Sequence, residues 1–293
     1  MKFSAFSLVY PATIEWFTRN YNRLHKHFDK WYIVYGFVDP QLKALSNYFG
    51  GTIPEKYTKP FDFPYQKLDG GTSTIMQMQI DGGTFSEKLE MCQAAYAEAA
   101  YDGMDYLMQI DADEWYTDEG ILEIKQMIKA VQPNIAPIKQ NKYWINYKRL
   151  YGGVWEDSPA RIFKVNENWN FLDHRPPAIG NEKEQYSRPV HIIGHPLCDH
   201  FCYVDDNQVF LKSLFFSEIR KDHPTYSKYL EWYFRWYQNY NERHSKGTWK
   251  YHPSEEPVFI NTPSASFCEV SDRYHDDEMF LSSFYNTHIL DHE

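Results

Sequence analysis

Residues 104–110 read MDYLMQI and residues 111–115 continue as DADEW, so an apolar run stops at three acids within four residues. A strand buried in a parallel sheet has a nearly continuous apolar sequence, and ligands of open α/β sheets bind just beyond the carboxyl ends of such strands. We therefore expect Asp111 and Asp113 at that edge of a sheet. The Asp-x-Asp pattern offers hard oxygen ligands to Mg²⁺ or Mn²⁺, ions that are usually held by one or two carboxylates together with substrate phosphates.

The same acids have a second interpretation, in which residues 111–119 only cap the helix that follows. Acidic side chains are favourable in the first turn of a helix because they interact with the positive end of its dipole. We favour cation binding, because the apolar run ends so abruptly at the acids.

Strand and helix patterns alternate ahead of this stretch. Apolar runs over residues 3–10 and 31–38 predict two strands, and residues 41–48 predict a short helix. Between the strands, Thr13 is placed to cap a helix with an apolar stripe. A passage rich in Gly and Pro then extends to about residue 71, and the sequence does not place its elements. The stripe of the first helix consists of Ile14, Phe17, Tyr21, Leu24 and Phe28.

A further helix leads into the acidic stretch, because Thr84 and Glu87 have the spacing of a capping box and apolar residues follow at helical intervals. The order strand, helix, strand, loop, helix, strand predicts an α/β fold with a mostly parallel central sheet and helices on its faces. Another helix is expected over residues 121–131. Residues 135–165 then change to aromatic-rich strand patterns, where an acceptor surface is expected.

Length and composition limit the possible classes of protein. The 293 residues fit one large α/β domain with an appendage, and 43% hydrophobic and 18% aromatic residues suffice for a sizeable core. A net charge of −10 opposes general attraction to nucleic acid or anionic membranes. Four cysteines and the absence of a long apolar run predict a cytoplasmic protein without a spanning helix.

Residues 225–240 form a dense aromatic stretch with basic residues among and around it. One interpretation is a C-terminal helical appendage whose rings pack onto the domain. The other is a surface that stacks on nucleic acid or sugars, or a helix that lies at an interface. We accordingly expect a nucleotide-binding and catalytic domain over residues 1–215 and an aromatic, helical C-terminal extension over residues 216–293.

Histidine and cysteine side chains cluster shortly before that extension. Such side chains are possible zinc ligands, but Cys198 and Cys202 form only one closely spaced pair and no second, distant pair is present. Buried cysteines that fill the core are the favoured interpretation. The cluster consists of His191, His195, Cys198, His200 and Cys202.

The order of these patterns resembles nucleotide-sugar glycosyltransferases of the single Rossmann-like GT-A type, particularly the family-two group. The resemblance covers about residues 3–215. Its centre is the Asp-x-Asp pattern after two strand–helix units, and its later part is the sequence SPARIF over residues 158–163. Other positions that carry it are Tyr10, Asp39, Lys88, Trp169, His174, His200 and Lys212.

This resemblance implies a donor site for a nucleoside diphosphate sugar, with a UDP-sugar favoured, and a bound Mn²⁺ or Mg²⁺. The ion neutralises the charge that develops on the departing diphosphate. Asp113 is implied as a metal ligand, with Asp111 contacting the ion through water or contacting the ribose, and His200 as a third ligand. Lys88 is implied at the diphosphate and Asp39 at the base. Residues Tyr10 and Pro11 flank that base.

An inverting transfer needs a general base near the acceptor hydroxyl. Many relatives have His-Glu where this chain has His174 followed by Arg175, so the usual acid is missing. Asp173 is therefore the first candidate, followed by His174 and Glu114. A retaining enzyme would not need a base at this place.

The acceptor implied by the resemblance is a saccharide, a lipid-linked saccharide or a protein. A hydroxylated base in DNA is a less favoured acceptor because of the net charge. A binding module whose acids hold a structural cation is the alternative outside enzymes. A nucleotidyltransferase is disfavoured because no Gly-rich phosphate loop occurs near residue 10. The sequence leaves the oligomeric state open.

Overall fold

The computed structural model describes residues 1–10, 13–36, 40–49, 73–78, 85–144, 146–151, 159–174, 176–203, 206–219, 228–233 and 259–260. The chain divides into two compact units. The first consists of Met1–Ser46, Gly51–Gln140 and Glu156–Asp199, and the second of Asn47–Gly50, Asn141–Trp155 and His200–Glu293. The boundary predicted between residues 215 and 216 stays a prediction.

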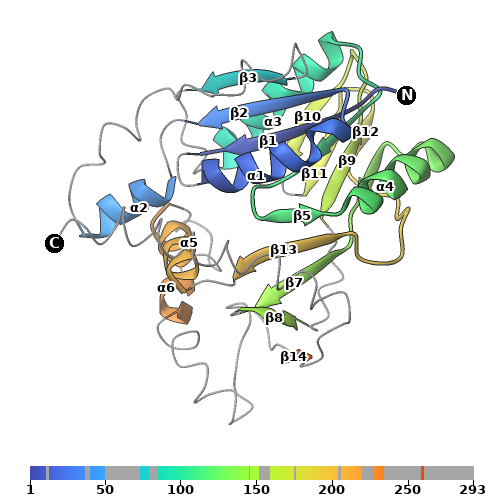
Figure 1. The fold of residues 1–293 in the computed structure, drawn as a ribbon. Coiled ribbons are helices and arrows are strands. Elements are labelled where there is room, and N and C mark those ends of the chain that lie inside the picture. The colour runs from blue at the N-terminus through green and yellow to red at the C-terminus, as the bar shows by residue number, and fades with distance from the viewer. Residues whose placement is uncertain are drawn as a thin grey trace. The chain divides into compact units, whose positions relative to one another are not determined.

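A six-stranded sheet forms the centre of the first unit, with the strand order β3-β2-β1-β4-β9-β6 (Figure 1). The four strands from β3 to β4 are parallel, and β9 runs antiparallel to both β4 and β6. The predicted α/β fold with a mostly parallel central sheet is therefore confirmed. The strands are β1 (Phe3–Val9), β2 (Lys30–Gly36), β3 (Ser73–Met78), β4 (Tyr106–Gln109), β6 (Ile135–Pro137) and β9 (Ala160–Lys164).

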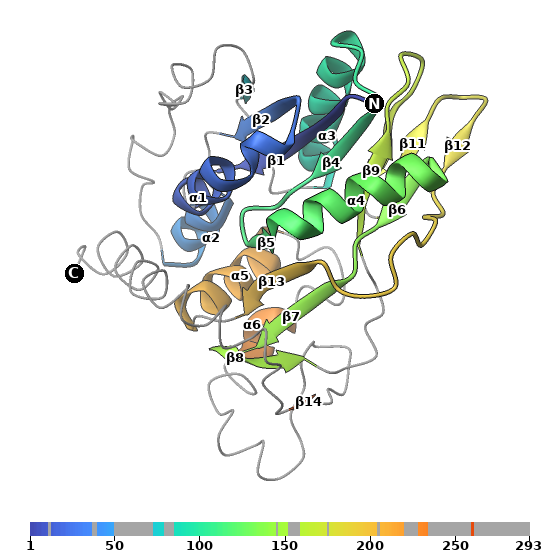
Figure 2. The same cartoon turned by 45° about the vertical axis from the view of Figure 1, so that its right-hand side comes forward.

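Helices pack on both faces of this sheet (Figures 1 and 2). Alternate residues of a strand point to opposite faces. Phe3, Ala5 and Val9 of β1 share one core cluster with residues of α1 and α4, whereas Phe6 belongs to a second cluster with residues of α3. The helices are α1 (Ile14–Leu24), the 3₁₀ turn η2 (His25–His27), α2 (Pro40–Phe49), α3 (Phe85–Tyr101) and α4 (Asp118–Val131).

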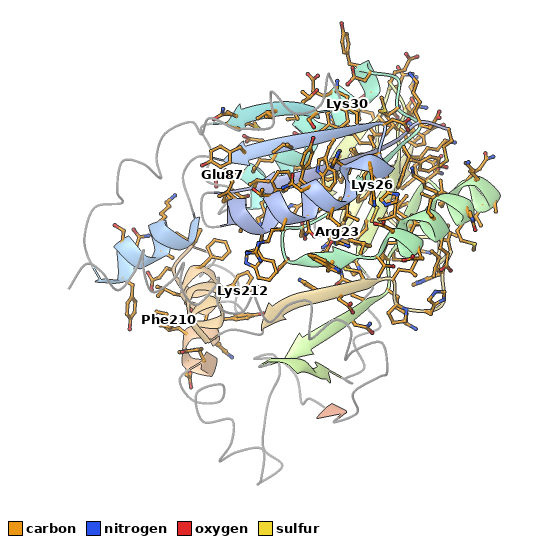
Figure 3. The ribbon with its side chains drawn as sticks, in the orientation of Figure 1. Arg23, Lys26, Lys30, Glu87, Phe210 and Lys212 are labelled. Atoms are coloured by element: carbon orange, nitrogen blue, oxygen red, sulfur yellow. The ribbon has the colours of Figure 1, made fainter. Side chains whose placement is uncertain are left out.

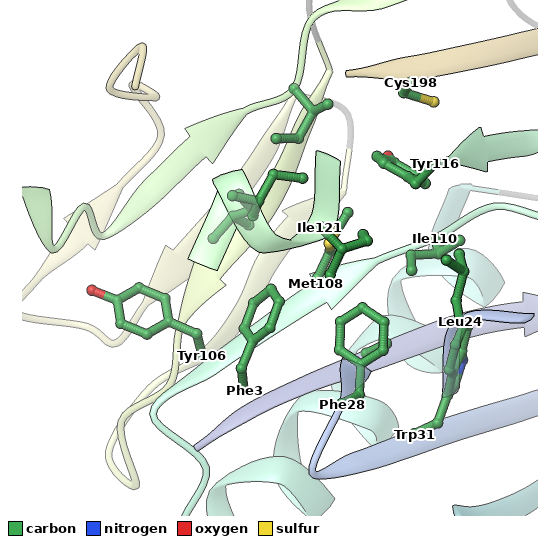
Figure 4. Packing of buried hydrophobic residues seen from close by; sticks show 14 of the residues in the cluster. Phe3, Leu24, Phe28, Trp31, Tyr106, Met108, Ile110, Tyr116, Ile121 and Cys198 are labelled. Atoms are coloured by element: carbon green, nitrogen blue, oxygen red, sulfur yellow. The ribbon is translucent and has the colours of Figure 1, made fainter. Parts of the chain in front are cut away.

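The core on the α1 and α4 face combines aliphatic side chains with a group of aromatic rings (Figure 4). Trp31 of β2 lies 5.2 Å from Phe28 and 5.3 Å from Tyr21, measured between ring centroids, and Phe3 lies 5.2 Å from Phe28. Aromatic pairs at such distances contribute about 0.5–1.5 kcal/mol beyond the burial of their area. The stripe predicted from the sequence therefore does pack against the sheet, but the prediction that Phe28 continues the helix is wrong, because α1 ends at Leu24 and Phe28 has extended backbone after η2.

The helix cap predicted at Thr13, before α1, had a mixed outcome. Thr13 precedes the helix as expected, but its side chain caps no helical N–H. Its hydroxyl instead accepts a hydrogen bond from the N–H of Tyr10 at 3.0 Å and donates to the Tyr10 carbonyl at 3.2 Å. Strand β3 follows the loop-rich passage, and the sequence did not place it. Thr84 and the Gly- and Pro-rich residues 50–72 lie outside the described residues.

A small antiparallel sheet packs beside α3 in the first unit. Phe171 of this sheet contacts Tyr96 of α3 and Phe163 of β9, with ring centroids 5.7 and 4.7 Å apart. Gly180 has φ +146°, and a Cβ there would meet the Glu184 carbonyl oxygen at 1.9 Å, so only glycine fits this turn. The strands are β10 (Asn170–His174), β11 (Pro177–Gly180) and β12 (Gln185–Tyr186).

The described residues of the second unit form strands that neighbour one another in the order β14-β8-β7-β13, and two helices. Tyr229 and Tyr233 belong to the aromatic stretch predicted over residues 225–240, and both are buried. Their rings lie 4.7 Å from Phe216 and 5.3 Å from Phe210. The described part of that stretch therefore packs as core. The elements are β7 (Gln140–Trp144), β8 (Asn146–Tyr151), β13 (Cys198–Tyr203), β14 (Phe259–Ile260), α5 (Asp206–Ile219) and α6 (Tyr229–Trp232).

Across the part of the chain that the structure describes, no helix combines the length and the apolar character needed to cross a membrane.

Helix α4 begins with a side-chain cap that can be tested. The Oγ1 atom of Thr117 accepts a hydrogen bond from the N–H of Gly120 at 3.0 Å. We expect Thr117→Ala to lower the free energy of unfolding by about 1 kcal/mol, because that N–H loses its partner. Thr117→Ser keeps the hydroxyl and is expected to change stability by less than about 0.5 kcal/mol. Urea unfolding measures both variants, and equal midpoints for Ala and Ser would contradict the assignment.

Candidate functional site

The acidic stretch begins where the central sheet ends. The N–H of Ile110 donates to the Phe6 carbonyl of β1 at 2.9 Å, and the Ser7 hydroxyl donates to the Ile110 carbonyl at 2.6 Å. Ile110 is buried, whereas the side chain of Asp111 is 33% exposed. The chain therefore emerges from the core at Asp111, at the carboxyl end of β4, as the sequence predicted.

The acids at this edge do not cap a helix. Asp111 and Asp113 precede the short strand β5 (Glu114–Tyr116), and helix α4 starts after it with Asp118 and Glu119 in its first turn. The helix-cap interpretation is therefore right for the last two acids and wrong for Asp111 and Asp113.

The turn that carries Asp113 is fixed by hydrogen bonds from inside the unit. The N–H of Glu114 donates to the Asp111 carbonyl at 3.1 Å, which closes the turn. The buried Asn20 of α1 donates through Nδ2 to the carbonyls of Ala112 at 3.0 Å and Glu114 at 2.8 Å. Since buried amides that satisfy two carbonyls hold the backbone in one geometry, the position of Asp113 is set by α1.

Helix α1 also holds the other end of β5. The guanidinium of Arg23 stacks over the Trp115 ring, 3.3 Å from its centroid, and donates to the Tyr116 carbonyl. Arg23 lies on α1 (Figure 3), so one helix contacts both the turn and the strand after it.

A buried ion pair lies directly beneath the turn. The Glu114 side chain is 0% exposed and that of Arg161 on β9 is 10% exposed. The Arg161 Nε donates to Glu114 Oε1 at 2.8 Å and Oε2 at 3.1 Å, and its Nη2 also contacts Oε1. Gln140 Nε2 donates to Oε1 at 2.5 Å and the Tyr116 hydroxyl donates to Oε2 at 3.2 Å. The carboxylate of Glu114 is therefore satisfied entirely by protein groups.

The same guanidinium reaches Asp111. Arg161 Nη2 donates to Asp111 Oδ2 at 2.6 Å, and Gln109 Nε2 donates to Oδ1 at 2.9 Å. Within the described part of the chain, each carboxylate oxygen thus accepts one hydrogen bond and keeps a second lone pair. Asp111 is held in one orientation while its exposed side remains available to a ligand.

The charges of this cluster sum to a negative value. Burial lowers the pKa of Arg161, but the charges of Asp111 and Glu114 raise it well above its ordinary value, so the guanidinium stays charged. Burial, Cys198 and Glu114 raise the pKa of Tyr116, whose phenol therefore stays neutral. Figure 4 shows Tyr116 and Cys198 beside one another. One cation and two carboxylates leave one negative charge before Asp113 is added.

Lys88 and Tyr10 lie at this same end of the unit. Lys88 is half-buried in the first turns of α3, one turn before Cys92. Burial raises the pKa of the Cys92 thiol to about 12; the charge of Asp111 adds to this rise, while those of Lys88 and Arg161 oppose it. All three charges therefore act near one buried atom. Tyr10 follows β1, and its hydroxyl contacts the Met91 sulfur at 3.3 Å.

The other predicted site residues divide into three groups. Pro11 and Asp39 lie outside the described residues. Asp173 is exposed and His174 half-buried on β10, paired with Ala178 and Pro177 of β11. His200 is half-buried on β13 in the second unit. The roles of these residues stay predictions.

The histidine and cysteine cluster does not assemble as a zinc site in the part of the chain that is described. His191 and His195 are exposed, and His195 Nε2 lies 3.3 Å from Glu123 Oε2. Cys198 is buried beside Tyr116. Among the described residues, no group of three or more His, Cys, Asp or Glu side chains is arranged to hold a metal ion.

Arg161 is the residue of this site whose role the sequence did not predict. In the sequence Arg161 is only one residue of the SPARIF pattern. The one feature that could have indicated its role is its charge within the apolar strand of residues 160–164. Gln140 and Asn20 give no such signal. Their function depends on contacts with residues 26 and 94 positions away in the sequence.

No protein-family model matches the sequence, and no curated protein matches it. Among solved structures, S. aureus TarS residues 1–349 in complex with UDP matches 84% of this chain and 75% of its own length, with 14% identity and a TM-score of 0.40. The complex with UDP-GlcNAc has the same identity and a TM-score of 0.38. Mannose-1-phosphate geranyltransferase from Thermus thermophilus covers 57% of this chain and 51% of its own length, with 13% identity and a TM-score of 0.30. Identities and TM-scores this low do not indicate a shared activity. The function is therefore inferred from the residues at the end of β4.

The buried pair leads to a prediction about stability. Arg161→Met leaves the Glu114 carboxylate buried without its cation, and we expect the free energy of unfolding to fall by about 3–5 kcal/mol. The double variant Glu114→Gln/Arg161→Met removes both charges and should recover most of that loss. Guanidinium unfolding measures all three proteins.

A second ion pair of the same unit serves as the control. Lys30 Nζ lies 2.6 Å from Asp102 Oδ2, with both side chains partly exposed. Lys30→Met should cost no more than about 1 kcal/mol, since water screens this pair. Equal losses for Lys30→Met and Arg161→Met would show that the Glu114–Arg161 pair is not energetically buried.

Proposed function

We propose that this protein is a metal-dependent glycosyltransferase that moves a sugar from a nucleoside diphosphate sugar to an acceptor hydroxyl. One observation carries the proposal: Asp111-Ala-Asp113 emerges at the carboxyl end of the parallel strand β4, beside the end of β1, on a turn held rigidly from below. Ligands of open α/β sheets bind at this edge.

The residues at the turn fit a hard divalent cation. The Asp111 carboxylate is partly exposed and Asp113 is half-buried on the same turn, and the cluster of Asp111, Glu114 and Arg161 carries a net negative charge. Oxygen ligands of this kind suit Mg²⁺ or Mn²⁺. Asp113 would hold the ion directly, Asp111 would contact it through water or contact the ribose, and His200 would be a third ligand. When bound, the ion would neutralise charge on the leaving diphosphate.

We propose the remaining donor contacts for Lys88, Tyr10, Pro11 and Asp39. Lys88, half-buried in the first turns of α3, would contribute a positive charge at the diphosphate. Tyr10 and Pro11 would flank the nucleotide base, and Asp39 would accept a hydrogen bond from it. A UDP-sugar is the favoured donor.

The general base is assigned to Asp173, with His174 as the alternative. A base must reach the acceptor hydroxyl, and Asp173 is exposed on β10. Glu114, the third candidate from the sequence, is 0% exposed and accepts hydrogen bonds from Arg161, Gln140 and Tyr116. Its contacts favour an anchoring role over proton transfer.

The acceptor is proposed to be a saccharide, a lipid-linked saccharide or a protein, and the protein is proposed to act in the cytoplasm. The net charge of −10 disfavours the DNA alternative, because phosphate contacts require clustered Lys and Arg.

Thermal unfolding with nucleotides and metal tests the proposal. UDP, GDP and a panel of their sugars are added to the full chain with and without Mn²⁺. We expect one nucleotide to raise the melting temperature only with Mn²⁺; binding at a hundred times the dissociation constant stabilises by about 2.7 kcal/mol. Asp113→Asn should abolish this response. Asp118→Asn, which removes an acid of α4 paired with Lys26, should keep it.

Two outcomes would contradict the proposal. If no nucleotide stabilises the chain in a metal-dependent way, the donor site is wrong. If a sugar nucleotide binds but the chain never releases free nucleotide from it, with water or with any acceptor, the protein is a binding module and not a transferase.

A further inference from the structure

We propose that Arg161 is a positioning residue, which acts on the metal and donor site by orienting the Asp111 carboxylate. This inference rests on the proposed function and adds a residue that itself would touch neither metal nor donor. Arg161 lies on β9, the antiparallel strand beside β4, and its guanidinium is buried beneath the acidic turn.

The guanidinium that contacts Asp111 is also held by Glu114. Its Nε donates to both oxygens of Glu114, at 2.8 and 3.1 Å. Glu114 is itself held by Gln140 at 2.5 Å and by Tyr116 at 3.2 Å. A planar guanidinium fixed along one edge cannot rotate freely, so the direction of its remaining N–H groups is set by the core.

The contact between Arg161 and Asp111 is the one that acts on the metal and donor site. Nη2 donates to Asp111 Oδ2 at 2.6 Å, while Gln109 holds Oδ1 at 2.9 Å. The carboxylate plane of Asp111 is therefore defined from two sides before any ligand binds. Preorganised carboxylates bind metals better than mobile ones, and removal of such outer partners typically costs about 10–100-fold in metal affinity or activity.

The fork shape of arginine is essential to this arrangement. One guanidinium contacts two different carboxylates, Glu114 in the core and Asp111 at the edge. A lysine ammonium keeps the charge that Glu114 needs, but as a point charge on a flexible stem it does not hold two carboxylates in fixed directions. Arg161→Lys should therefore separate the stabilising charge from the positioning role.

A double-mutant cycle on metal affinity tests the inference. The affinity for Mn²⁺ is measured in the presence of saturating UDP, from the electron paramagnetic resonance signal of free Mn²⁺, for wild type, Arg161→Lys, Asp111→Asn and the double variant. We expect each single variant to weaken binding about tenfold or more. If Arg161 acts through Asp111, the double variant is no more than about twofold weaker than Asp111→Asn alone.

A matched control comes from the opposite end of the strands. Lys30 begins β2 and pairs with Asp102, whereas Asp111 follows the end of β4 (Figure 3 labels Lys30). Lys30→Met should leave Mn²⁺ affinity within about twofold of wild type, because it removes a charge far along the sheet from the turn. Should Arg161→Lys not fold, Glu114→Gln/Arg161→Met replaces it, since both buried charges are then absent and Asp111 still loses its partner.

The outcomes separate the two proposals. If wild type binds no Mn²⁺ with UDP or any other nucleotide, the proposed function fails and the inference fails with it. If wild type binds and the folded Arg161 variant binds equally well, only the positioning role is wrong. Losses that multiply in the double variant would also overturn it, because Arg161 would then act independently of Asp111.

Discussion

The ion pair between Glu114 and Arg161 is the interaction on which the edge of the sheet depends. It joins β5, just after the acidic turn, to β9, whose residue lies 47 positions further along the chain. A carboxylate that is 0% exposed is costly unless it is paired and its remaining lone pairs are satisfied. Gln140 and Tyr116 complete that requirement. The buried carboxylate of Glu114 therefore requires hydrogen-bond donors at the positions that surround it.

This constraint explains why the acids at the surface are ordered. Asp111 shares the guanidinium with Glu114, and the backbone of residues 112 and 114 is held by Asn20. Two elements, α1 and β9, thus both hold the turn. The arrangement concentrates negative charge at an exposed position while every buried member of the cluster is compensated, which is the electrostatic condition that a cation site requires.

The local patterns of the sequence were sufficient for three of the four parallel strands of the sheet, and β3 was not predicted. Residues 3–10 and 104–110 contain β1 and β4, residues 31–38 overlap β2, and the predicted stripe packs on the sheet, although the helix that carries it ends at Leu24 and not at Phe28. Such patterns reflect burial, which acts on each segment separately. They do not report pairing, so the antiparallel insertion of β9 and the contacts of Arg161 were not predictable. Thr13 shows the same limit at short range, because its hydroxyl bonds Tyr10 instead of the helix.

The burial of Glu114 also constrains the search for a general base. A group that accepts a proton during turnover must be able to lose its hydrogen-bond donors or share them with substrate. Among the described residues, protonation of Glu114 would leave Asp111 as the one charged partner of Arg161 and would weaken the pair beneath the turn. The acid closest in sequence to the proposed metal ligands is therefore poorly suited to proton transfer. Asp173 is exposed on β10 and is not a member of that pair, and for this reason it remains the better candidate even though its sequence context departs from the His-Glu pattern.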